Sequence, residues 1–287
     1  MSSEARSHAR GLLCVVAAAL LWSTGGLGIK SVPEPALVVA FYRSAIAAVV
    51  LVVLLRPRGW RVTPAFVVAS VSYALSLTTF VMATKMTTAA NAIFLQYSGV
   101  IWVLLLSPLV LGEPIRGRDL TAVGLAIGGM ALFFVGRIEA GSLNGNLLAV
   151  LSGVFFAALT LALRASRGSG AEAAVVWGNL VAVAMLLPFV ASDLAIPTRS
   201  AVVLGLLGVF QIGAAYALFV TGLRTVTATR ASLTGMIEPV ANPIWVFLLL
   251  GETPSPWALA GGAVVLAAIT WHSLQAPDAT LPVPPQD

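Results

Sequence analysis

Two charged residues, Arg43 and Glu238, lie deep inside apolar stretches of the sequence. Arg43 is about 12 Å from the start of the run 35–55 at the helical rise of 1.5 Å per residue. Glu238 lies similarly deep in the run 229–250. Because a charge at the centre of a bilayer costs at least about 2.5–3.5 kcal/mol, each side chain should face protein or water.

Two chemistries are open to this pair. Arg43 could bind a substrate carboxylate, and Glu238 could take up a proton or bind an ammonium group. Alternatively, the two satisfy each other, helix-end carbonyls or other buried polar groups. Pro239 favours a structural role for Glu238, because a proline inside a membrane helix leaves backbone groups that need new partners.

A second group of candidate residues combines aromatic rings that have polar edges with one amide, mostly deep in apolar runs. Its members are Trp22, Tyr42, Tyr73, Gln96, Tyr97, Trp177 and Tyr216. Amphipathic rings usually collect at membrane interfaces, and deep ones need partners for their OH and NH groups. We predict that these seven line one substrate site with Arg43 and Glu238, Trp177 lying opposite Arg43. Taken singly, each could equally be a packing residue.

Enzyme chemistry has no support in the sequence. There is no zinc-protease, nucleophile-elbow or phosphate-binding-loop motif. The two histidines, His8 and His272, lie in the N-terminal tail and at the end of the last apolar run. The single cysteine, Cys14, rules out a disulfide within the chain. We therefore expect no catalytic residue, no metal site and no cofactor, and the protein is not expected to be an enzyme.

Ten apolar segments must position the candidate residues. Of the 287 residues, 59% are hydrophobic and 9% are charged, whereas soluble proteins have roughly 25% charged residues. Ten runs are long enough to cross about 30 Å of hydrocarbon. They cover residues 11–29, 35–55, 64–84, 88–111, 119–136, 146–164, 173–190, 201–221, 229–250 and 256–274. Their connections are short, so we predict an all-α membrane protein of ten transmembrane helices.

An internal repeat relates the two halves of the chain. One constant shift places Phe80–Glu113 on Phe219–Glu252 without a gap, and Leu-Gly-Glu closes both segments. Further upstream, a slightly smaller shift pairs Gly11 with Gly145 and Lys30 with Arg164. More identities stand in register than composition alone supplies, so the halves are interpreted as structural repeats.

The predicted organisation is a five-helix repeat over 11–136, a second over 146–273 and a short cytoplasmic tail over 274–287. Because five is odd, the second half enters the membrane from the opposite side, which makes the repeats inverted. Inverted repeats recur in secondary transporters, whose substrate site lies near the membrane midplane between the halves. This architecture predicts a transporter.

The distribution of Lys and Arg predicts the orientation. With the N-terminus inside, eleven lie on the cytoplasmic side: Arg6, Arg10, Arg56, Arg58, Arg61, Arg116, Arg118, Arg164, Arg167, Arg224 and Arg230. Four lie outside: Lys30, Lys85, Arg137 and Arg199. This excess predicts that both termini are cytoplasmic. The basic residues form no patch or stripe, so the net charge of +5 does not indicate a nucleic-acid partner.

The second half of the chain resembles the EamA branch of the drug/metabolite transporter superfamily. The resemblance rests on Ala215-Tyr216-Ala217-Leu218, Gly222-Leu223-Arg224, Ala231-Ser232-Leu233, Glu238-Pro239-Val240, Ile244-Trp245 and Leu249-Leu250-Gly251-Glu252. It extends over nearly the whole chain, and it implies ten spans in two repeats and export of small metabolites, often amino acids, from the bacterial cytoplasm. The first half has Gly99-Val100 in place of Glu238-Pro239, so a role of that pair is not duplicated. Within the family, the deep aromatic residues and Arg43 look closest to aromatic-amino-acid exporters.

The function expected from the sequence is alternating-access export of amino acids, aromatic or otherwise apolar, across the bacterial inner membrane. The carrier would be a uniporter or proton-linked, with the substrate carboxylate at Arg43 or at a helix N-terminus. A multidrug or cationic-compound exporter that uses Glu238 as counter-charge is the alternative, and a channel is a further one. The expected partners are a small-molecule substrate and the lipid bilayer. The oligomeric state stays open, and a monomer is compatible with the pattern.

Overall fold

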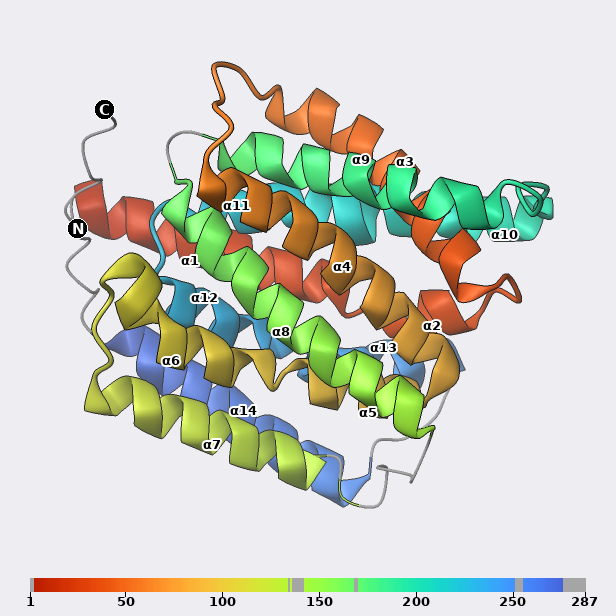
Figure 1. Cartoon of the computed structure of the whole chain (residues 1–287). Coiled ribbons are helices and arrows are strands. Elements are labelled where there is room, and N and C mark those ends of the chain that lie inside the picture. The colour runs from red at the N-terminus through yellow and green to blue at the C-terminus, as the bar shows by residue number, and fades with distance from the viewer. Residues whose placement is uncertain (1–2, 134, 136–141, 168–169, 251–254, 276–287) are drawn as a thin grey trace.

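The computed structural model describes residues 3–133, 135, 142–167, 170–250 and 255–275, and every regular element in these ranges is a helix (Figure 1). In chain order these are α1 (Ser3–Trp22), α2 (Gly25–Lys30), α3 (Ala36–Leu55), α4 (Pro64–Met86), α5 (Ala89–Gln96), α6 (Gly99–Leu111), α7 (Gly117–Phe133), α8 (Leu143–Ala165), α9 (Ala171–Val190), α10 (Thr198–Leu206), the π-helical segment η1 (Leu207–Ala214), α11 (Ala215–Leu223), α12 (Ala228–Gly235), α13 (Ile237–Leu250) and α14 (Pro256–Leu274). The all-α prediction is confirmed.

Eight helical segments within the described ranges are long and apolar enough to cross a membrane. They coincide with eight of the ten predicted runs. The other two runs are also helical over their described residues, one as the 17-residue α7 and the other as α12 followed by α13, but neither is among the eight. The number of ten crossings therefore stays a prediction.

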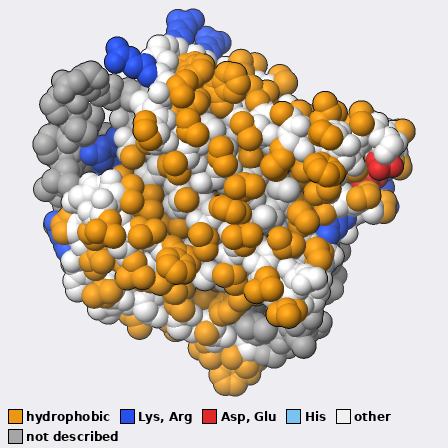
Figure 2. Space-filling model, viewed as in Figure 1, with side chains coloured by type: hydrophobic (Ala, Val, Ile, Leu, Met, Phe, Trp, Pro, Cys, Tyr) orange, Lys and Arg blue, Asp and Glu red, His pale blue; other side chains and the backbone are white. Residues whose placement is uncertain are grey.

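The outer surface of the bundle is strongly apolar. Figure 2 shows one broad face covered almost continuously by hydrophobic side chains, with Lys and Arg gathered at its margins. Large apolar residues are widely exposed, among them Leu109 at 82% and Phe189 at 69%. Soluble monomers rarely expose contiguous apolar patches beyond a few hundred Å². A surface of this kind is suited to contact with lipid.

Helices of one half pack mainly against helices of the other half, in a reciprocal pattern. The α4 helix packs against α8, and its counterpart α11 packs against α1, the counterpart of α8. The α3 helix packs against α9, and α7 packs against α14 at the opposite edge of the bundle (Figure 1). Each pair joins segments from different halves, so the interior is formed jointly by both.

Glycines allow the closest of these approaches. A Cβ atom on Gly153 of α8 would lie 2.3 Å from the carbonyl oxygen of Gln96. A Cβ atom on Gly222 of α11 would lie 2.7 Å from the carbonyl oxygen of Gly11 in α1. Both contacts are with backbone, which cannot move aside, so only glycine fits at these two positions.

Two helices are interrupted at equivalent places in the two halves. The hydroxyl oxygens of Thr88 and Thr227, which the internal repeat aligns with each other, accept hydrogen bonds that cap α5 and α12. Each capped helix has eight residues and ends at Tyr97 or Met236, where the backbone dihedrals are nearly the same (φ −68°, ψ −6° and φ −65°, ψ −1°). The chain then continues as α6 or α13. The shared caps place the starts of α5 and α12 in register, and both helices then break after the same number of residues.

Candidate functional site

A small cavity lies between the two helix breaks. It is lined by residues from both halves, including Gln96, Tyr97 and Val100 at the first break and Glu238 after the second. Its free space is about 40 Å³, whereas one water needs roughly 10–15 Å³ measured in this way. The cavity in this conformation therefore has room for a few water molecules and none for a metabolite.

Arg43 is the cationic residue among the described side chains that line the cavity. Its side chain is 1% exposed, and its Nη2 atom donates a hydrogen bond to Oε1 of Gln211. Among the described residues, its Nε and Nη1 atoms have no hydrogen-bond partner. A buried guanidinium group normally uses its donors, and an unmet one costs roughly 1–3 kcal/mol or more. Arg43 is thus left with unused donors at the edge of a cavity.

The partner of Arg43 is positioned by the π-helical segment η1. A Cβ atom on Gly208 would lie 2.7 Å from the Cβ atom of Ile46, and one on Gly213 would lie 2.6 Å from Cγ1 of Val50. These two glycines bring η1 against α3, and Gln211 between them reaches Arg43. Single turns of π-helix are frequent at functional sites. Our sequence reasoning missed Gln211, although a lone amide in the apolar run 201–221 was a signal.

Glu238 lies on the same cavity and is 7% exposed. It is in the first turn of α13, directly after the break at Met236. The hydroxyl oxygen of Tyr97, at the other break, is 2.8 Å from Oε2 of Glu238 and 2.7 Å from the carbonyl oxygen of Gly235. The two breaks are therefore joined through one tyrosine hydroxyl.

Aromatic rings form an apolar side of the cavity. The ring centroid of Trp22 is 5.1 Å from that of Tyr216 and 5.8 Å from that of Phe156. All three residues line the cavity. The Nε1 atom of Trp22 is buried without a hydrogen-bond partner in the described part of the chain. Gln96 is held at the edge by a 2.8 Å hydrogen bond from Nε2 to Oγ of Ser152.

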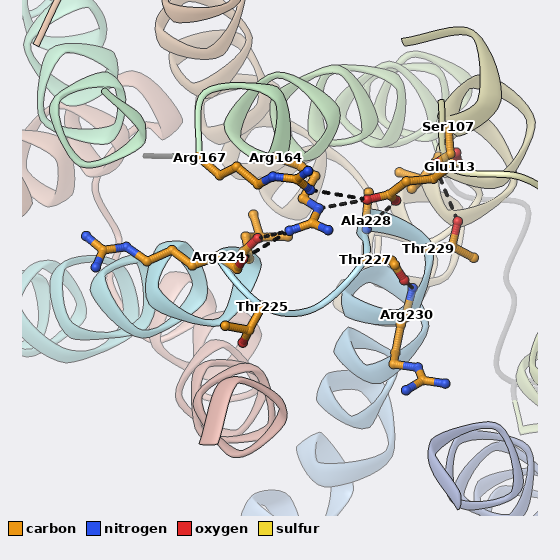
Figure 3. A network of polar contacts seen from close by, with 12 residues as sticks. Ser107, Glu113, Arg164, Arg167, Arg224, Thr225, Thr227, Ala228, Thr229 and Arg230 are labelled. Carbon is orange, nitrogen blue, oxygen red and sulfur yellow. Dashed lines mark hydrogen bonds and ion pairs between the residues drawn. The ribbon is translucent and has the colours of Figure 1, made fainter. Parts of the chain in front are cut away.

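A second polar cluster closes one end of the bundle, where α6 and α8 end and α12 begins (Figure 3). Oε1 of Glu113 accepts a 2.7 Å hydrogen bond from Nε of Arg164. Oε2 accepts a 3.1 Å bond from the backbone N–H of Ala228, at the start of α12. The Nη1 atom of Arg164 donates to the carbonyl oxygens of Leu223 and Arg224 at 2.8 and 3.2 Å. We call Glu113, Arg164 and the backbone groups that they bind the end network.

A second cation borders the end network. Nη1 of Arg167 is 3.8 Å from Oε1 of Glu113. Partial burial, and then repulsion from Arg164, lower the pKa of Arg167, while Glu113 acts in the opposite sense. One carboxylate thus serves two guanidinium groups. Our sequence reasoning used Glu113 only as a marker of the repeat and did not pair it with Arg164.

Comparison with known proteins settles the family. Residues 9–135 and 143–274 each match the EamA-like transporter family. The chain belongs to this family. Two separate matches, one in each half, agree with the reciprocal packing of the helices.

Relatives of this EamA-like transporter include characterised and uncharacterised proteins. The pseudopaline exporter CntI of Pseudomonas aeruginosa is 27% identical over 267 residues, which are 90% of this chain and 94% of that protein. An uncharacterised transporter of Archaeoglobus fulgidus is 26% identical over 261 residues, again 90% and 94% of the two chains. An uncharacterised Pseudomonas aeruginosa protein is 30% identical over 190 residues, 63% of this chain and 65% of that one.

A solved crystal structure shares the fold. Its TM-score is 0.78 at 18% identity, and the match covers 91% of this chain and 95% of the other. The family and the apolar helices together make the chain a multi-pass membrane transporter of the EamA type. Within the described residues, no group of three or more His, Cys, Asp or Glu is placed to hold a metal ion.

Six of the nine predicted site residues of this EamA-like transporter line the cavity. They are Trp22, Arg43, Gln96, Tyr97, Tyr216 and Glu238. Tyr73 does not line it, although its ring centroid is 4.5 Å from that of Tyr216.

The structure places the remaining two candidates away from the cavity. The hydroxyl of Tyr42 donates a 2.5 Å hydrogen bond to the carbonyl oxygen of Leu194. Trp177 is 42% exposed, and its ring centroid is 5.6 Å from that of Trp60. The expectation that Trp177 lies across the cavity from Arg43 is therefore corrected.

Helical geometry explains both displacements. Successive residues on a helix are about 100° apart. Because Arg43 points to the cavity, its neighbour Tyr42 points elsewhere. Gly178 packs against Tyr73, where a Cβ atom would lie 2.6 Å from the tyrosine Cβ, so Trp177 one position earlier is turned outward.

Proposed function

We propose that this transporter is a carrier that exports small carboxylate-bearing metabolites, amino acids foremost, across the bacterial inner membrane by alternating access. The observation that carries the proposal is Arg43, which is almost fully buried, lines the cavity and has two nitrogen atoms without a partner among the described residues. A substrate carboxylate would supply the missing acceptors, because guanidinium and carboxylate match in geometry and charge.

The other walls of the cavity suit the rest of an amino acid. Glu238 offers a counter-charge for an ammonium group, and Trp22, Phe156 and Tyr216 offer apolar surface for an aromatic or aliphatic side chain. One relative is named a pseudopaline exporter, which supports export of a small metabolite. Because the free space is only about 40 Å³ here, helices must separate before a substrate can enter, as alternating access requires.

The proposed architecture has ten crossings in two inverted five-helix repeats. It is supported by the reciprocal packing of the halves, by the helix breaks in register and by the two family matches. Five crossings in each half would invert one repeat relative to the other and place the cavity near the midplane. The excess of Arg on the side of the end network favours cytoplasmic termini.

The test is counterflow in proteoliposomes. The purified protein is reconstituted, and uptake of a panel of labelled amino acids is measured with and without unlabelled amino acid trapped inside. Saturable uptake that trapped substrate stimulates is expected, and Arg43→Met should weaken it strongly. Arg199→Met is the matched control, since Arg199 is exposed and lies outside the cavity. Rapid uptake without saturation would indicate a channel, and no uptake by folded, inserted protein would refute the amino-acid proposal.

A cationic-compound exporter is the second candidate, and Glu238 is the observation that favours it. A buried carboxylate beside aromatic rings also suits an apolar cation. The two proposed functions predict that transport is lost in different variants. Transport of a cationic dye that Glu238→Gln abolishes and Arg43→Met leaves intact would favour this second function.

A further inference from the structure

We propose that Glu238 is the proton-binding site of the transport cycle, and that Tyr97 transmits its protonation to the break between α12 and α13. The inference rests on the proposed carrier function and adds the ion to which transport is coupled. One proton would bind to the carboxylate from one side of the membrane and leave to the other side as the cavity changes access.

The hydroxyl group of Tyr97 faces two hydrogen-bond acceptors. The hydroxyl oxygen of Tyr97 lies within hydrogen-bond distance of two acceptors, Oε2 of Glu238 at 2.8 Å and the carbonyl oxygen of Gly235 at 2.7 Å. A tyrosine hydroxyl has one hydrogen, so it donates to only one of them. With Glu238 ionised, Tyr97 must share this hydrogen between the two acceptors or give it to one of them. Each contact is a full hydrogen bond of its own when the carboxyl group of Glu238 carries a proton and donates it to Tyr97, which then donates to Gly235.

Loss of the proton from Glu238 would change the hydrogen bond that Tyr97 donates. An ionised Glu238 can only accept, so the hydroxyl hydrogen of Tyr97 turns toward the carboxylate. The carbonyl of Gly235 then loses this donor. Gly235 is the last residue of α12, where carbonyl groups have no partner within the helix. The protonation of one side chain therefore decides whether the carbonyl group at the end of α12 has the hydroxyl of Tyr97 as its donor.

The surroundings of Glu238 favour its ionised form in one respect and its neutral form in another. Its place in the first turn of α13 favours the ionised form, because free N–H groups and the helix dipole point toward it. Its burial on a cavity walled largely by apolar and aromatic residues favours the neutral form. The other ionisable groups that act on Glu238 are Arg43 on α3, Tyr97 at the first break and Tyr216 on α11. Arg43 is the only cation among these three, and a bound substrate carboxylate would occupy it.

The first half of the chain has no carboxyl group at the position equivalent to Glu238. The shift that aligns the two halves places Gly99 on Glu238. A Cβ atom on Gly99 would lie 2.5 Å from the carbonyl oxygen of Gly153, so that position is reserved for close packing of α6 against α8. Among the described residues that line the cavity, Glu238 is accordingly the one with a carboxyl group.

The principal experiment uses the reconstituted full-length protein with a pH gradient. For a one-to-one exchange, one pH unit sustains about tenfold accumulation. Wild-type protein should accumulate the labelled amino acid against its gradient when the pH gradient is imposed. Glu238→Gln should weaken counterflow, because the counter-charge for the ammonium group is lost, and the counterflow that remains should no longer be driven to accumulation by the pH gradient. Glu172→Gln, an acidic residue paired with Arg224 outside the cavity, is the matched control and should behave as wild type.

The outcomes separate the inference from the function on which it rests. Counterflow by the wild type that ignores the pH gradient, or full accumulation by Glu238→Gln, would overturn the proton site and leave the carrier intact. Absence of counterflow for the whole panel would overturn the carrier and the proton site together.

A spectroscopic measurement tests the tyrosine link without transport. The infrared carbonyl stretch of a protonated carboxylic acid should be present in the purified wild type and missing in Glu238→Gln. It should shift in Tyr97→Phe, which keeps the ring and removes only the hydroxyl, and stay in place in the control Tyr42→Phe. Identical bands in the wild type and Tyr97→Phe would overturn the link, and this pair remains informative if Glu238→Gln does not fold.

Discussion

Arg43 and Arg164 are both 1% exposed inside helical segments, yet their surroundings differ completely. Arg164 donates to the carboxylate of Glu113 and to the carbonyl oxygens of Leu223 and Arg224. Arg43 donates to Gln211, and its two other nitrogen atoms have no partner among the described residues. The two guanidinium groups are therefore equally buried but differ in their hydrogen bonds. The protein supplies acceptors for Arg164, whereas two nitrogen atoms of Arg43 lack one among the described residues.

The position of each arginine along its helix explains the contrast. Arg164 is in the last turn of α8 and faces the end of α11, where carbonyl groups are free of helical hydrogen bonds. Arg43 is in the interior of α3, and carbonyl groups inside a helix already accept hydrogen bonds from N–H groups of the same helix. There a guanidinium group depends on side chains, water or a ligand. Unmet donors, rather than burial, are therefore what makes Arg43 the proposed binding residue and Arg164 a structural one.

The largest expected effect would come from removing the satisfied arginine. Arg164→Met leaves Glu113 buried without its main cation, and breaking a buried ion pair costs about 3–5 kcal/mol of the free energy of unfolding. Reversible unfolding in mixed detergent micelles would measure it. Arg164→Lys should lose less because it keeps the charge, and adding Glu113→Gln to Arg164→Met should restore part of the loss. An Arg164→Met variant as stable as the wild type would contradict the structural role assigned to Arg164.

Removal of the unsatisfied arginine should have the opposite profile. Arg43→Met gives up one bond to Gln211 and relieves an unmet buried charge, so the free energy of unfolding should change little. Loss of charge-assisted bonds to a carboxylate is worth about 1.5–3 kcal/mol, so substrate affinity in counterflow should fall about ten- to a hundredfold. A large loss of stability without a loss of affinity would assign Arg43 a structural role.

Tyr42 provides a further test, because it is next to Arg43 in the sequence but does not line the cavity. Tyr42→Phe removes the hydrogen bond to the carbonyl oxygen of Leu194, which should cost about 0.5–1.5 kcal/mol of unfolding free energy. The affinity for substrate should not change. A drop in affinity comparable to that of Arg43→Met would mean that the cavity extends to this residue in another conformation.

The smallest effect is expected at Trp177, which is partly exposed on the outer side of α9. Trp177→Phe keeps an aromatic ring against Trp60 and should change stability by less than about 0.5 kcal/mol. Counterflow should be unaffected. Loss of transport in this variant, with folding intact, would restore the sequence-based prediction that Trp177 contacts substrate.

Much of the secondary structure could be predicted from residue types alone. An apolar run in lipid has to be helical, because every backbone N–H and C=O must find its partner within the segment. The equivalent residues Thr88 and Thr227 likewise cap equivalent helices. The breaks at Tyr97 and Met236 were not predicted, because Gly99 and Gly235 beside them are ordinary residues of membrane helices and Pro239 follows only the second break.

Arg43 and Glu238 stand out in the sequence because a charge in hydrocarbon is costly wherever it lies, so their need for polar surroundings was evident before any fold was known. Which surroundings they obtain depends on helices distant in the chain. Glu113 and Arg164 are 51 residues apart, and Arg43 and Gln211 are 168 apart. The direction of each side chain follows from how its helix is rotated against those neighbours, and that rotation is set by packing of both halves together, which no single run encodes.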